Sequence, residues 1–186
     1  MKKFELTTEF ITNAFGKKLF RIKALVEFGD VKAGELGGYV EKEENVSQDG
    51  NAWVSGDARV YGNAWVYGDA RVSGDAWVSG NARVSGDARV SGNAWVSGNA
   101  RVSGDALVFG DADYALVQGF GTEFRCTTFY RGKDKKIMVN CGCFHGNLEA
   151  FRKQAKETRS GKIAKEYLMI ADLMEYHFAS EDSSDE

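Results

Sequence analysis

The sequence predicts a mainly β protein whose centre is a parallel β-solenoid, and three features of the chain carry that prediction. A six-residue unit, Asn/Asp-Ala-X-Val-X-Gly, repeats ten times without an insertion between Asn51 and Gly110. The 186 residues include 22 glycines and no proline, which excludes collagen-like and proline-rich chains. Hydrophobic residues make up 43% of the chain and charged residues 27%, so a packed core is expected.

Each six-residue unit, or hexad, has the pattern of a short strand followed by a turn. The Ala and Val of a unit are two positions apart, so in an extended segment both point to one side. The variable Trp, Arg or Leu between them points to the other side. Gly and Asn/Asp follow, and these residues tolerate the left-handed backbone angles of a corner. One hexad cannot bury its two apolar side chains alone, so successive coils must stack.

The repeat resembles that of the hexapeptide-repeat left-handed β-helix proteins, in which three hexads form one triangular coil. The resemblance covers Asn51 to Gly110 and implies a left-handed parallel β-helix. In such a coil, residues eighteen apart in the chain stack at the ~4.8 Å spacing of neighbouring strands. Three outward columns follow: Trp53, Arg71, Arg89 and Leu107; Arg59, Trp77 and Trp95; Trp65, Arg83 and Arg101.

All four tryptophans of the protein are therefore expected on the outside of the solenoid. Stacking of Trp and Arg for stability is one interpretation of this pattern. An interface is the other, because a monomer rarely exposes so much aromatic surface. Cyclic trimers are common in the hexapeptide family, so the resemblance implies a homo-oligomer, either a trimer or a dimer.

The repeat and its flanks divide the chain into four predicted parts. Alternating apolar residues before the repeat predict a hairpin with strands over Phe4–Ile11 and Leu19–Val26. After the repeat, the pattern predicts strands over Glu123–Arg131 and Lys136–Phe144 and then two amphipathic helices. The parts are an N-terminal β-hairpin over residues 1–30, the β-helix over 31–119, a C-terminal ββαα module over 120–179 and a disordered acidic tail over 180–186.

The β-helix is expected to begin and end irregularly. Leu36–Tyr39 is predicted as its first coil. Val46–Gly50 is predicted as a small corner insertion, because Val46 and Val54 are eight residues apart instead of six. Asp111–Leu116 loses the pattern and predicts the exit coil.

Charge and cysteine content narrow the class of protein. The net charge of -3 indicates no long nucleic acid as partner, and no apolar run approaches the ~20 residues of a membrane span. Three cysteines are typical of a reducing compartment, so a cytoplasmic location is expected.

The cysteines also raise the question of a metal. Cys141, Cys143 and His145 would share one face of a continuous strand, with Cys126 on the facing strand, and Cys and His are good zinc ligands. The alternative is two buried structural cysteines. The C-x-C-x-H spacing is not a common ligand spacing, so we expect no metal and no cofactor.

Enzymatic interpretations receive little support from the sequence. The hexapeptide-repeat acyltransferases that the repeat resembles use a histidine as general base, near a loop that leaves the helix. The repeat of this chain has neither a loop nor a histidine, and the two histidines, His145 and His177, lie in the C-terminal part. The related carbonic anhydrases bind a metal through three histidines, a set that this chain with its two histidines lacks. The sequence also contains no nucleotide P-loop. The chain is therefore not expected to be an enzyme.

The arginines of the repeat carry the main hypothesis about function. Stacked arginines place like charges on adjacent strands, which is unfavourable unless corner aspartates or a bound anion compensate. A guanidinium fork beside an indole suits a phosphate joined to a nucleobase. The basic and aromatic C-terminal part, with a net charge of +4 between Gly121 and Ala179, is a second candidate. The candidate ligand-binding residues are Arg71, Arg89, Arg83, Arg101, Trp77, Trp95, Arg125 and Arg131.

The segments outside the repeat show a resemblance that covers nearly the whole chain. Lys32–Asn45, Gly119–Glu123, Cys141–Phe144 and Ile163–Leu168 resemble a family of phage and prophage hexapeptide-repeat proteins, which vary in the number of hexads between a fixed head and tail. The resemblance carries no catalytic residues. It implies a protein that acts on the host by binding a defence protein or a nucleotide signal.

The sequence thus predicts a non-catalytic binding protein that sequesters a small phosphate-containing nucleotide and so inhibits a host defence pathway. A structural or protein-interaction module that binds a host or phage protein is the alternative. A hexapeptide-repeat acyltransferase is the second alternative.

Overall fold

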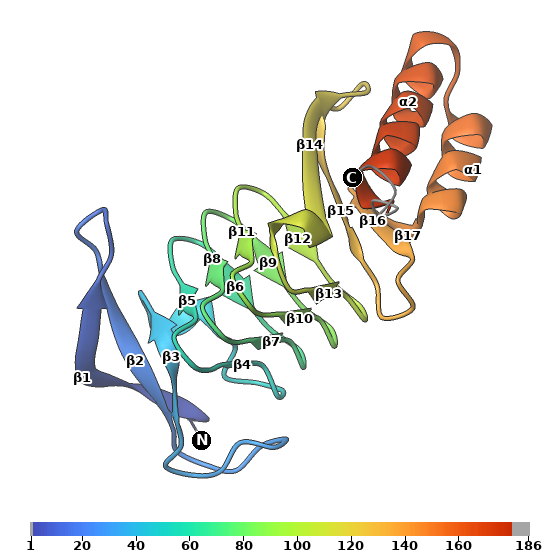
Figure 1. Ribbon diagram of the computed structural model, residues 1–186. Coiled ribbons are helices and arrows are strands. Elements are labelled where there is room, and N and C mark those ends of the chain that lie inside the picture. The colour runs from blue at the N-terminus through green and yellow to red at the C-terminus, as the bar shows by residue number, and fades with distance from the viewer. Residues whose placement is uncertain (1, 180–186) are drawn as a thin grey trace, which may run out of the picture.

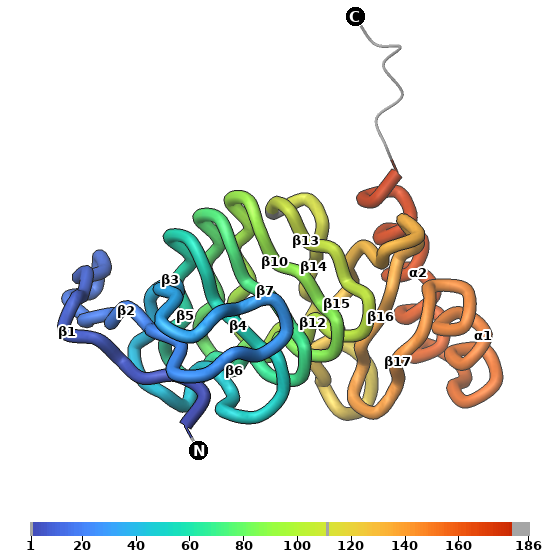
Figure 2. The backbone as a smooth tube through the Cα atoms, turned by 90° about the horizontal axis from the view of Figure 1, so that it is seen from below, coloured from blue at the N-terminus to red at the C-terminus, as the bar shows by residue number. Residues whose placement is uncertain are grey.

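The protein is a β-solenoid between two antiparallel units, as the computed structural model shows for residues 2–179 (Figure 1). The N-terminal strands lie at one end of the solenoid and the two helices at the other (Figure 2). This confirms the predicted mainly β class, with stacked parallel strands, an N-terminal hairpin and C-terminal helices. The left-handed winding stays a prediction from the resemblance, and the acidic tail, 180–186, lies outside the described residues.

Ten two-residue strands form the solenoid and pair into parallel sheets on its three sides. One side is the sheet β13-β10-β7-β4, a second is β12-β9-β6, and the third is β5-β8-β11. Residues eighteen apart in the chain are direct neighbours on adjacent strands. Trp77 and Trp95 are one such pair, which confirms the predicted columns. The strands are β4 (Trp53–Val54), β5 (Arg59–Val60), β6 (Trp65–Val66), β7 (Arg71–Val72), β8 (Trp77–Val78), β9 (Arg83–Val84), β10 (Arg89–Val90), β11 (Trp95–Val96), β12 (Arg101–Val102) and β13 (Leu107–Val108).

The repeated alanines and valines fill the interior of the solenoid. Every repeat Ala and Val between Ala52 and Val108 is at most 1% exposed, so their predicted inward direction is confirmed. At one corner the amides of Asn63, Asn81 and Asn99 form a ladder, with donor–acceptor distances of 3.2 and 3.0 Å. This ladder uses the amides to join successive coils, so it is a turn device and not a binding site.

The N-terminal hairpin extends one side of the solenoid. β1 (Phe4–Thr12) pairs antiparallel with β2 (Lys18–Ala24), and β2 pairs antiparallel with β3 (Leu36–Val40). β3 then pairs in parallel with β5, so the complete sheet has the order β1-β2-β3-β5-β8-β11. The predicted hairpin and first coil are thereby confirmed, and a short 3₁₀ helix, η1 (Glu43–Asn45), precedes the corner insertion.

Trp53 corrects the expectation that all four tryptophans lie on the outside. Its side chain points out of the coil, but the N-terminal segment covers it and leaves it only 2% exposed. The rings of Phe4 and Phe28 meet the indole edge-on, with centroids at 6.2 and 5.4 Å. Trp77 is half-buried, while Trp65 and Trp95 stay exposed at 39% and 49%. Trp53 is therefore part of a core between the N-terminal segment and the solenoid.

Lys3 is buried at the same junction and should make stability depend on pH. Its ammonium donates to the carbonyl oxygens of Gly50 and Ala52, at 3.2 and 2.9 Å, and its side chain is 4% exposed. Burial, reinforced by the charge of Arg71, lowers the pKa of Lys3 from 10.5 to about 8. Between these values the unfolded chain binds the proton that the folded protein has released. The free energy of unfolding should therefore rise by about 2 kcal/mol between pH 7.5 and 9.5.

The variant Lys3→Met is the control for this prediction, because it keeps an unbranched apolar stem beside Phe28 and removes the titrating group. Burial also raises the pKa of Cys126, which lowers stability as the pH increases in both proteins. The difference between the two proteins in urea unfolding at each pH isolates Lys3. Parallel pH profiles for wild type and Lys3→Met would contradict the assignment.

The C-terminal unit is a four-stranded antiparallel sheet followed by two helices. The predicted strand pair and both helices are present, but the sheet has two strands more than predicted. The elements are η2 (Asp111–Asp113), β14 (Tyr114–Phe120), β15 (Arg125–Arg131), β16 (Ile137–Cys141), β17 (Phe144–Asn147), α1 (Leu148–Thr158) and α2 (Gly161–Phe178).

One of the additional strands replaces the predicted exit coil. Residues 114–120 pair with β15, so the chain leaves the solenoid after Val108 instead of continuing it to residue 119. The reason is that this strand has two apolar faces. Tyr114 packs against the solenoid core, whereas Ala115 and Val117 pack against the core beneath the helices.

The other additional strand arises from a tight turn that the sequence analysis placed within one strand. Cys141 pairs with Phe144, so Gly142 and Cys143 form a two-residue hairpin turn between β16 and β17. Gly142 has a φ of 63°, in the left-handed region that such turns require. The predicted strand Lys136–Phe144 is therefore broken, and Cys141 and His145 lie on different strands.

Side chains from the C-terminal sheet close the last coil of the solenoid. The amide of Arg101 donates to Thr128 Oγ1 at 2.9 Å, and Asn140 Nδ2 donates to the Arg101 carbonyl at 2.8 Å. Tyr130 is fully buried beside them, and its hydroxyl lies 3.1 Å from Nε2 of His145. Burial raises the pKa of Tyr130. Polar side chains thus satisfy backbone groups that a further coil would otherwise bind.

Candidate functional site

The structure distributes the predicted repeat residues over three separate faces. Arg71 and Arg89 lie on β7 and β10, and Arg83 and Arg101 lie on β9 and β12. Trp77 and Trp95 lie on the third side, on β8 and β11. A single site that combines all six side chains therefore does not form, and each face has to be considered separately.

On the side with Trp77 and Trp95, the aromatic residues contact each other and one arginine. The two indoles meet edge-on with centroids at 5.9 Å, and the guanidinium of Arg59 lies 5.0 Å above the ring of Trp77. These are the stacking contacts expected if the column serves stability.

The side with Arg83 and Arg101 carries an open groove at one end. This groove has a volume of about 630 Å³, and Lys42, Glu44, Trp65 and Arg83 contribute to its lining. Arg101 lies toward the other end, where its Nη1 donates to the carbonyl of Gly142 at 3.4 Å. The two arginines of this face therefore have different surroundings.

The two candidate arginines of the C-terminal unit also differ. Arg131 contacts Asp113 through Nε at 3.2 Å and donates through Nη2 to the carbonyl of Phe178 at 2.7 Å. Its guanidinium also lies 5.5 Å from the centre of the Phe178 ring. Arg131 thus fastens the end of α2 to the sheet. Arg125, in contrast, is exposed and lines a small cavity beneath the helices.

A larger groove lies over the sheet β4-β7-β10-β13, and we call it the solenoid groove. Its volume is about 920 Å³. Arg71 and Arg89 line the bottom of the groove, and two segments outside the repeat form the walls at its two ends. Its lining residues are Gly29, Asp30, Asn51, Asp69, Arg71, Ser73, Asp87, Arg89, Ser91, Asp105, Leu107, Phe109 and Lys133.

The two arginines of the solenoid groove have different partners. Arg71 forms an ion pair with Asp30 of the N-terminal unit. Arg89 is exposed and makes no ion pair within the described part of the chain. Among the described residues, no ion pair joins a repeat arginine to a corner aspartate, so the expected compensation by the repeat aspartates does not take that form.

Residues from outside the repeat complete the groove beside Arg89. Arg89 pairs with Leu107 of the next coil. Ala106 forms an isolated bridge with Gly132, which brings the adjoining Lys133 to this end of the groove. The side chain of Phe109 is 56% exposed there. Sequence analysis missed both Lys133 and Phe109 as site residues, because their position depends on how the C-terminal sheet docks on the solenoid.

The lining of the solenoid groove is close to neutral in charge. Three cations, Arg71, Arg89 and Lys133, face four carboxylates, of which Asp69, Asp87 and Asp105 stack in one corner column and the fourth is Asp30. Guanidinium and ammonium groups bind phosphate, while carboxylates accept hydrogen bonds from hydroxyl and amino groups. The groove therefore suits a ligand that has both an anionic part and neutral donors.

The cysteine and histidine side chains considered as metal ligands do not converge. Cys126 faces the solenoid, with its thiol 3.5 Å from the Asn99 carbonyl, whereas Cys141 accepts from Thr127 Oγ1 at 3.1 Å. Cys143 is exposed, and His145 contacts Tyr130. Within residues 2–179, no group of three His, Cys, Asp or Glu side chains has the arrangement of a metal site.

Comparison with known proteins supports the solenoid alone. The family described as YdcK β-solenoid repeat matches four overlapping segments, residues 52–68, 64–80, 76–92 and 82–98. These segments lie within the repeat, so the similarity identifies a repeat β-solenoid and says nothing of the flanking units. No curated protein matches the chain. In the described part of the chain, neither helix combines the length and the hydropathy that a membrane span requires.

Proposed function

We propose that this protein is a non-catalytic binding protein that holds a small phosphate-bearing nucleotide in the solenoid groove. The observation that carries the proposal is the end of the groove where Arg89, Lys133 and Phe109 line one space. Arg89 and Lys133 supply two cations for a phosphate, and the exposed ring of Phe109 offers a surface on which a base stacks. Asp87 and Asp105 supply acceptors for ribose hydroxyls and base amino groups.

The near-neutral lining selects against highly charged ligands. A nucleic acid or a polyphosphate would meet four carboxylates as well as three cations, whereas a mononucleotide or dinucleotide brings little charge. Sequestering such a nucleotide in the host cytosol, and so blunting a defence signal, is the role that the resemblance to phage proteins adds to this proposal.

Calorimetric titration with a panel of mononucleotides and dinucleotides tests the proposal. We expect Arg89→Ala to weaken binding at least tenfold, since a hydrogen bond to a charged group contributes about 1.5–3 kcal/mol. Arg83→Ala is the matched control, because Arg83 holds the same place in the preceding hexad and is also exposed, but on another side. Its affinity should stay within about twofold of wild type.

Two results would contradict this function. One is the absence of binding for every nucleotide in the panel, and the other is an equal loss in Arg83→Ala and Arg89→Ala. The first result would favour the alternative of a protein-interaction module.

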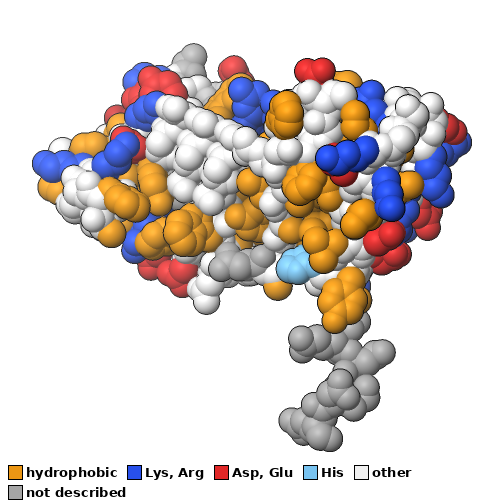
Figure 3. Space-filling model, turned by 90° about the horizontal axis from the view of Figure 1, so that it is seen from above, with side chains coloured by type: hydrophobic (Ala, Val, Ile, Leu, Met, Phe, Trp, Pro, Cys, Tyr) orange, Lys and Arg blue, Asp and Glu red, His pale blue; other side chains and the backbone are white. Residues whose placement is uncertain are grey.

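The exposed apolar side chains favour that second candidate function. Trp95, Phe120 and Phe124 are 49%, 42% and 68% exposed, and on α2 Leu173 and Tyr176 are 58% and 83% exposed. Hydrophobic side chains gather along the middle of the face seen in Figure 3. Contiguous apolar surface of this kind marks protein interfaces. A host protein, a phage protein or further copies of this chain in a dimer or trimer are the partners that this alternative proposes.

A further inference from the structure

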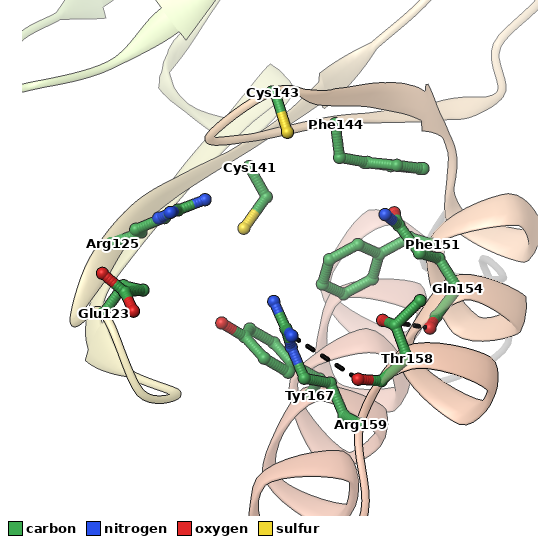
Figure 4. A pocket seen from close by; sticks show the side chains of 11 residues that line it. Glu123, Arg125, Cys141, Cys143, Phe144, Phe151, Gln154, Thr158, Arg159 and Tyr167 are labelled. Carbon is green, nitrogen blue, oxygen red and sulfur yellow. Dashed lines mark hydrogen bonds between the residues drawn. The ribbon is translucent and has the colours of Figure 1, made fainter.

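A second, smaller cavity lies beneath the helices and is separate from the solenoid groove. It opens between the strands β15 to β17 and the helices α1 and α2, and it has a volume of about 70 Å³ (Figure 4). Phe144 and Phe151 form an apolar wall on one side, with their ring centroids 5.7 Å apart. Arg125, Arg159 and Tyr167 line the rest of the space together with the thiol of Cys141.

The two arginines of this cavity come from different elements and lack carboxylate partners. Arg125 begins β15, and Arg159 is the C-cap residue that follows α1. Neither forms an ion pair with any residue of the described chain. Arg152, also on α1, makes two ion pairs at 2.7 Å, with Asp172 and Glu175. Asp172 and Glu175 of α2 are thus directed to Arg152, and the two guanidiniums at the cavity remain without an ion pair among the described residues.

Tyr167 places a hydroxyl group between these two charges. Figure 4 shows Arg125 and Arg159 on different sides of the cavity, with the Tyr167 hydroxyl and the Cys141 thiol between them. Burial raises the pKa of Tyr167, whereas the positive charges of Arg159 and Arg125 lower it. Both guanidiniums therefore interact electrostatically with the phenol hydroxyl. The hydroxyl makes no hydrogen bond to another described residue.

We propose that this cavity binds a tetrahedral oxyanion of the phosphate class. Donors reach the space from three different elements: Arg125 from β15, Arg159 from the end of α1 and Tyr167 from α2. A planar carboxylate is satisfied by one guanidinium fork, whereas a phosphate has acceptor atoms for all three donors. The lining carries two guanidinium groups and one carboxylate, so its net charge is positive and favours an anion. The cavity is small and open, so the ligand is free phosphate or the exposed phosphomonoester of a larger molecule.

Glu123 gives the proposal a distinctive prediction. Its carboxylate lines the same cavity and repels an anion. The variant Glu123→Gln should therefore bind phosphate several-fold more tightly than wild type, which is a gain that a merely structural role of these residues does not produce.

Calorimetry with the full chain and inorganic phosphate, with acetate at matched ionic strength as comparison, tests the site. We expect saturable binding of phosphate and none of acetate, and a loss of at least tenfold in Arg125→Gln and in Arg159→Gln. Phenyl phosphate distinguishes the two sources of the ligand: tighter binding than inorganic phosphate indicates a phosphomonoester, and weaker binding indicates the free ion. The control is Lys153→Gln, which removes an exposed cation of α1 that pairs with Glu157 and does not line the cavity, and it should leave phosphate binding unchanged. Arg125→Gln should leave nucleotide binding in the solenoid groove unchanged, so failure of the nucleotide proposal is distinguishable from failure of this one.

A second measurement keeps the test valid if a variant folds poorly. Cys141 and Cys143 line the cavity, so phosphate should slow their alkylation by neutral iodoacetamide in wild type and leave the rate at Cys126 unchanged. The proposal is overturned if phosphate gives no saturable heat and no protection, if acetate binds as well as phosphate, or if Glu123→Gln binds no better than wild type.

Discussion

Trp53→Ala is expected to lower the free energy of unfolding by about 4 kcal/mol, whereas Trp95→Ala lowers it by about 1 kcal/mol. Both tryptophans hold the same position in the hexad, but Trp53 is 2% exposed and Trp95 is 49% exposed. Truncating Trp53 leaves a cavity between the rings of Phe4 and Phe28 and the first coil. Truncating Trp95 removes its edge contact with Trp77 and the hydrogen bond from its Nε1 to Ser79 Oγ, but this indole is half exposed, so less apolar surface loses its burial.

Urea unfolding followed by circular dichroism measures the two losses, and amide hydrogen exchange shows where the structure opens. In a solenoid each coil contacts only its neighbours, so damage at one end spreads weakly to the other. Exchange in Trp53→Ala should accelerate in β1 to β3 and stay unchanged in β14 to β17. Equal destabilisation by both variants would mean that the hairpin does not cover Trp53 in solution.

The contrast between these tryptophans marks how far the sequence predicts the fold. Within the repeat, every hexad contains the information for its own conformation: the Ala and Val face inward because they are two apart, and the corner follows from Gly and Asn/Asp. The columns follow from a period without insertions. Local rules decide all of these features, so sequence analysis predicts them correctly.

Contacts between distant segments decide the features that the sequence does not predict. Trp53 is buried because Phe28, which is far from it in the chain, docks on it. Residues 114–120 form a strand because they lie between two cores, and the alternation of apolar residues alone does not reveal the second core. The turn at Gly142 had a local signal, since glycine favours the left-handed φ found there, but the alternating cysteines around it resemble a continuous strand.

The candidate site divides in the same way. The period predicts that Arg71 and Arg89 are stacked neighbours, and the structure confirms it. The period does not predict which of three faces is hollow. The solenoid groove forms on this face because the segment with Asp30 rises at one end and the turn with Lys133 at the other. Arginine is a residue type that often binds ligands, but Arg131 uses its guanidinium for contacts with Asp113 and Phe178 of the protein itself.

Gly37→Ala should be almost as damaging as the loss of Trp53, for the opposite reason. A β-carbon on Gly37 would lie 2.5 Å from Cγ1 of Ile22, 2.6 Å from the carbonyl oxygen of Val54 and 2.7 Å from Cζ2 of Trp53. These atoms belong to the hairpin, to the backbone of the first coil and to the indole between them, so no single neighbour can move to relieve the contact. We expect a loss of about 3 kcal/mol, at the upper end of the range for overpacked cores.

Gly110→Ala is the matched control, because no atom lies within 4 Å of the position of its β-carbon and neither glycine has a left-handed φ. Its stability should stay within about 0.5 kcal/mol of wild type. The double variant Gly37→Ala/Trp53→Ala separates overpacking from loss of the indole. Removing the indole relieves one of the three contacts, so the double variant should lose less than the sum of the single losses. Simple additivity would show that Gly37 and Trp53 act at separate places, and the hairpin and the first coil would then not share one core.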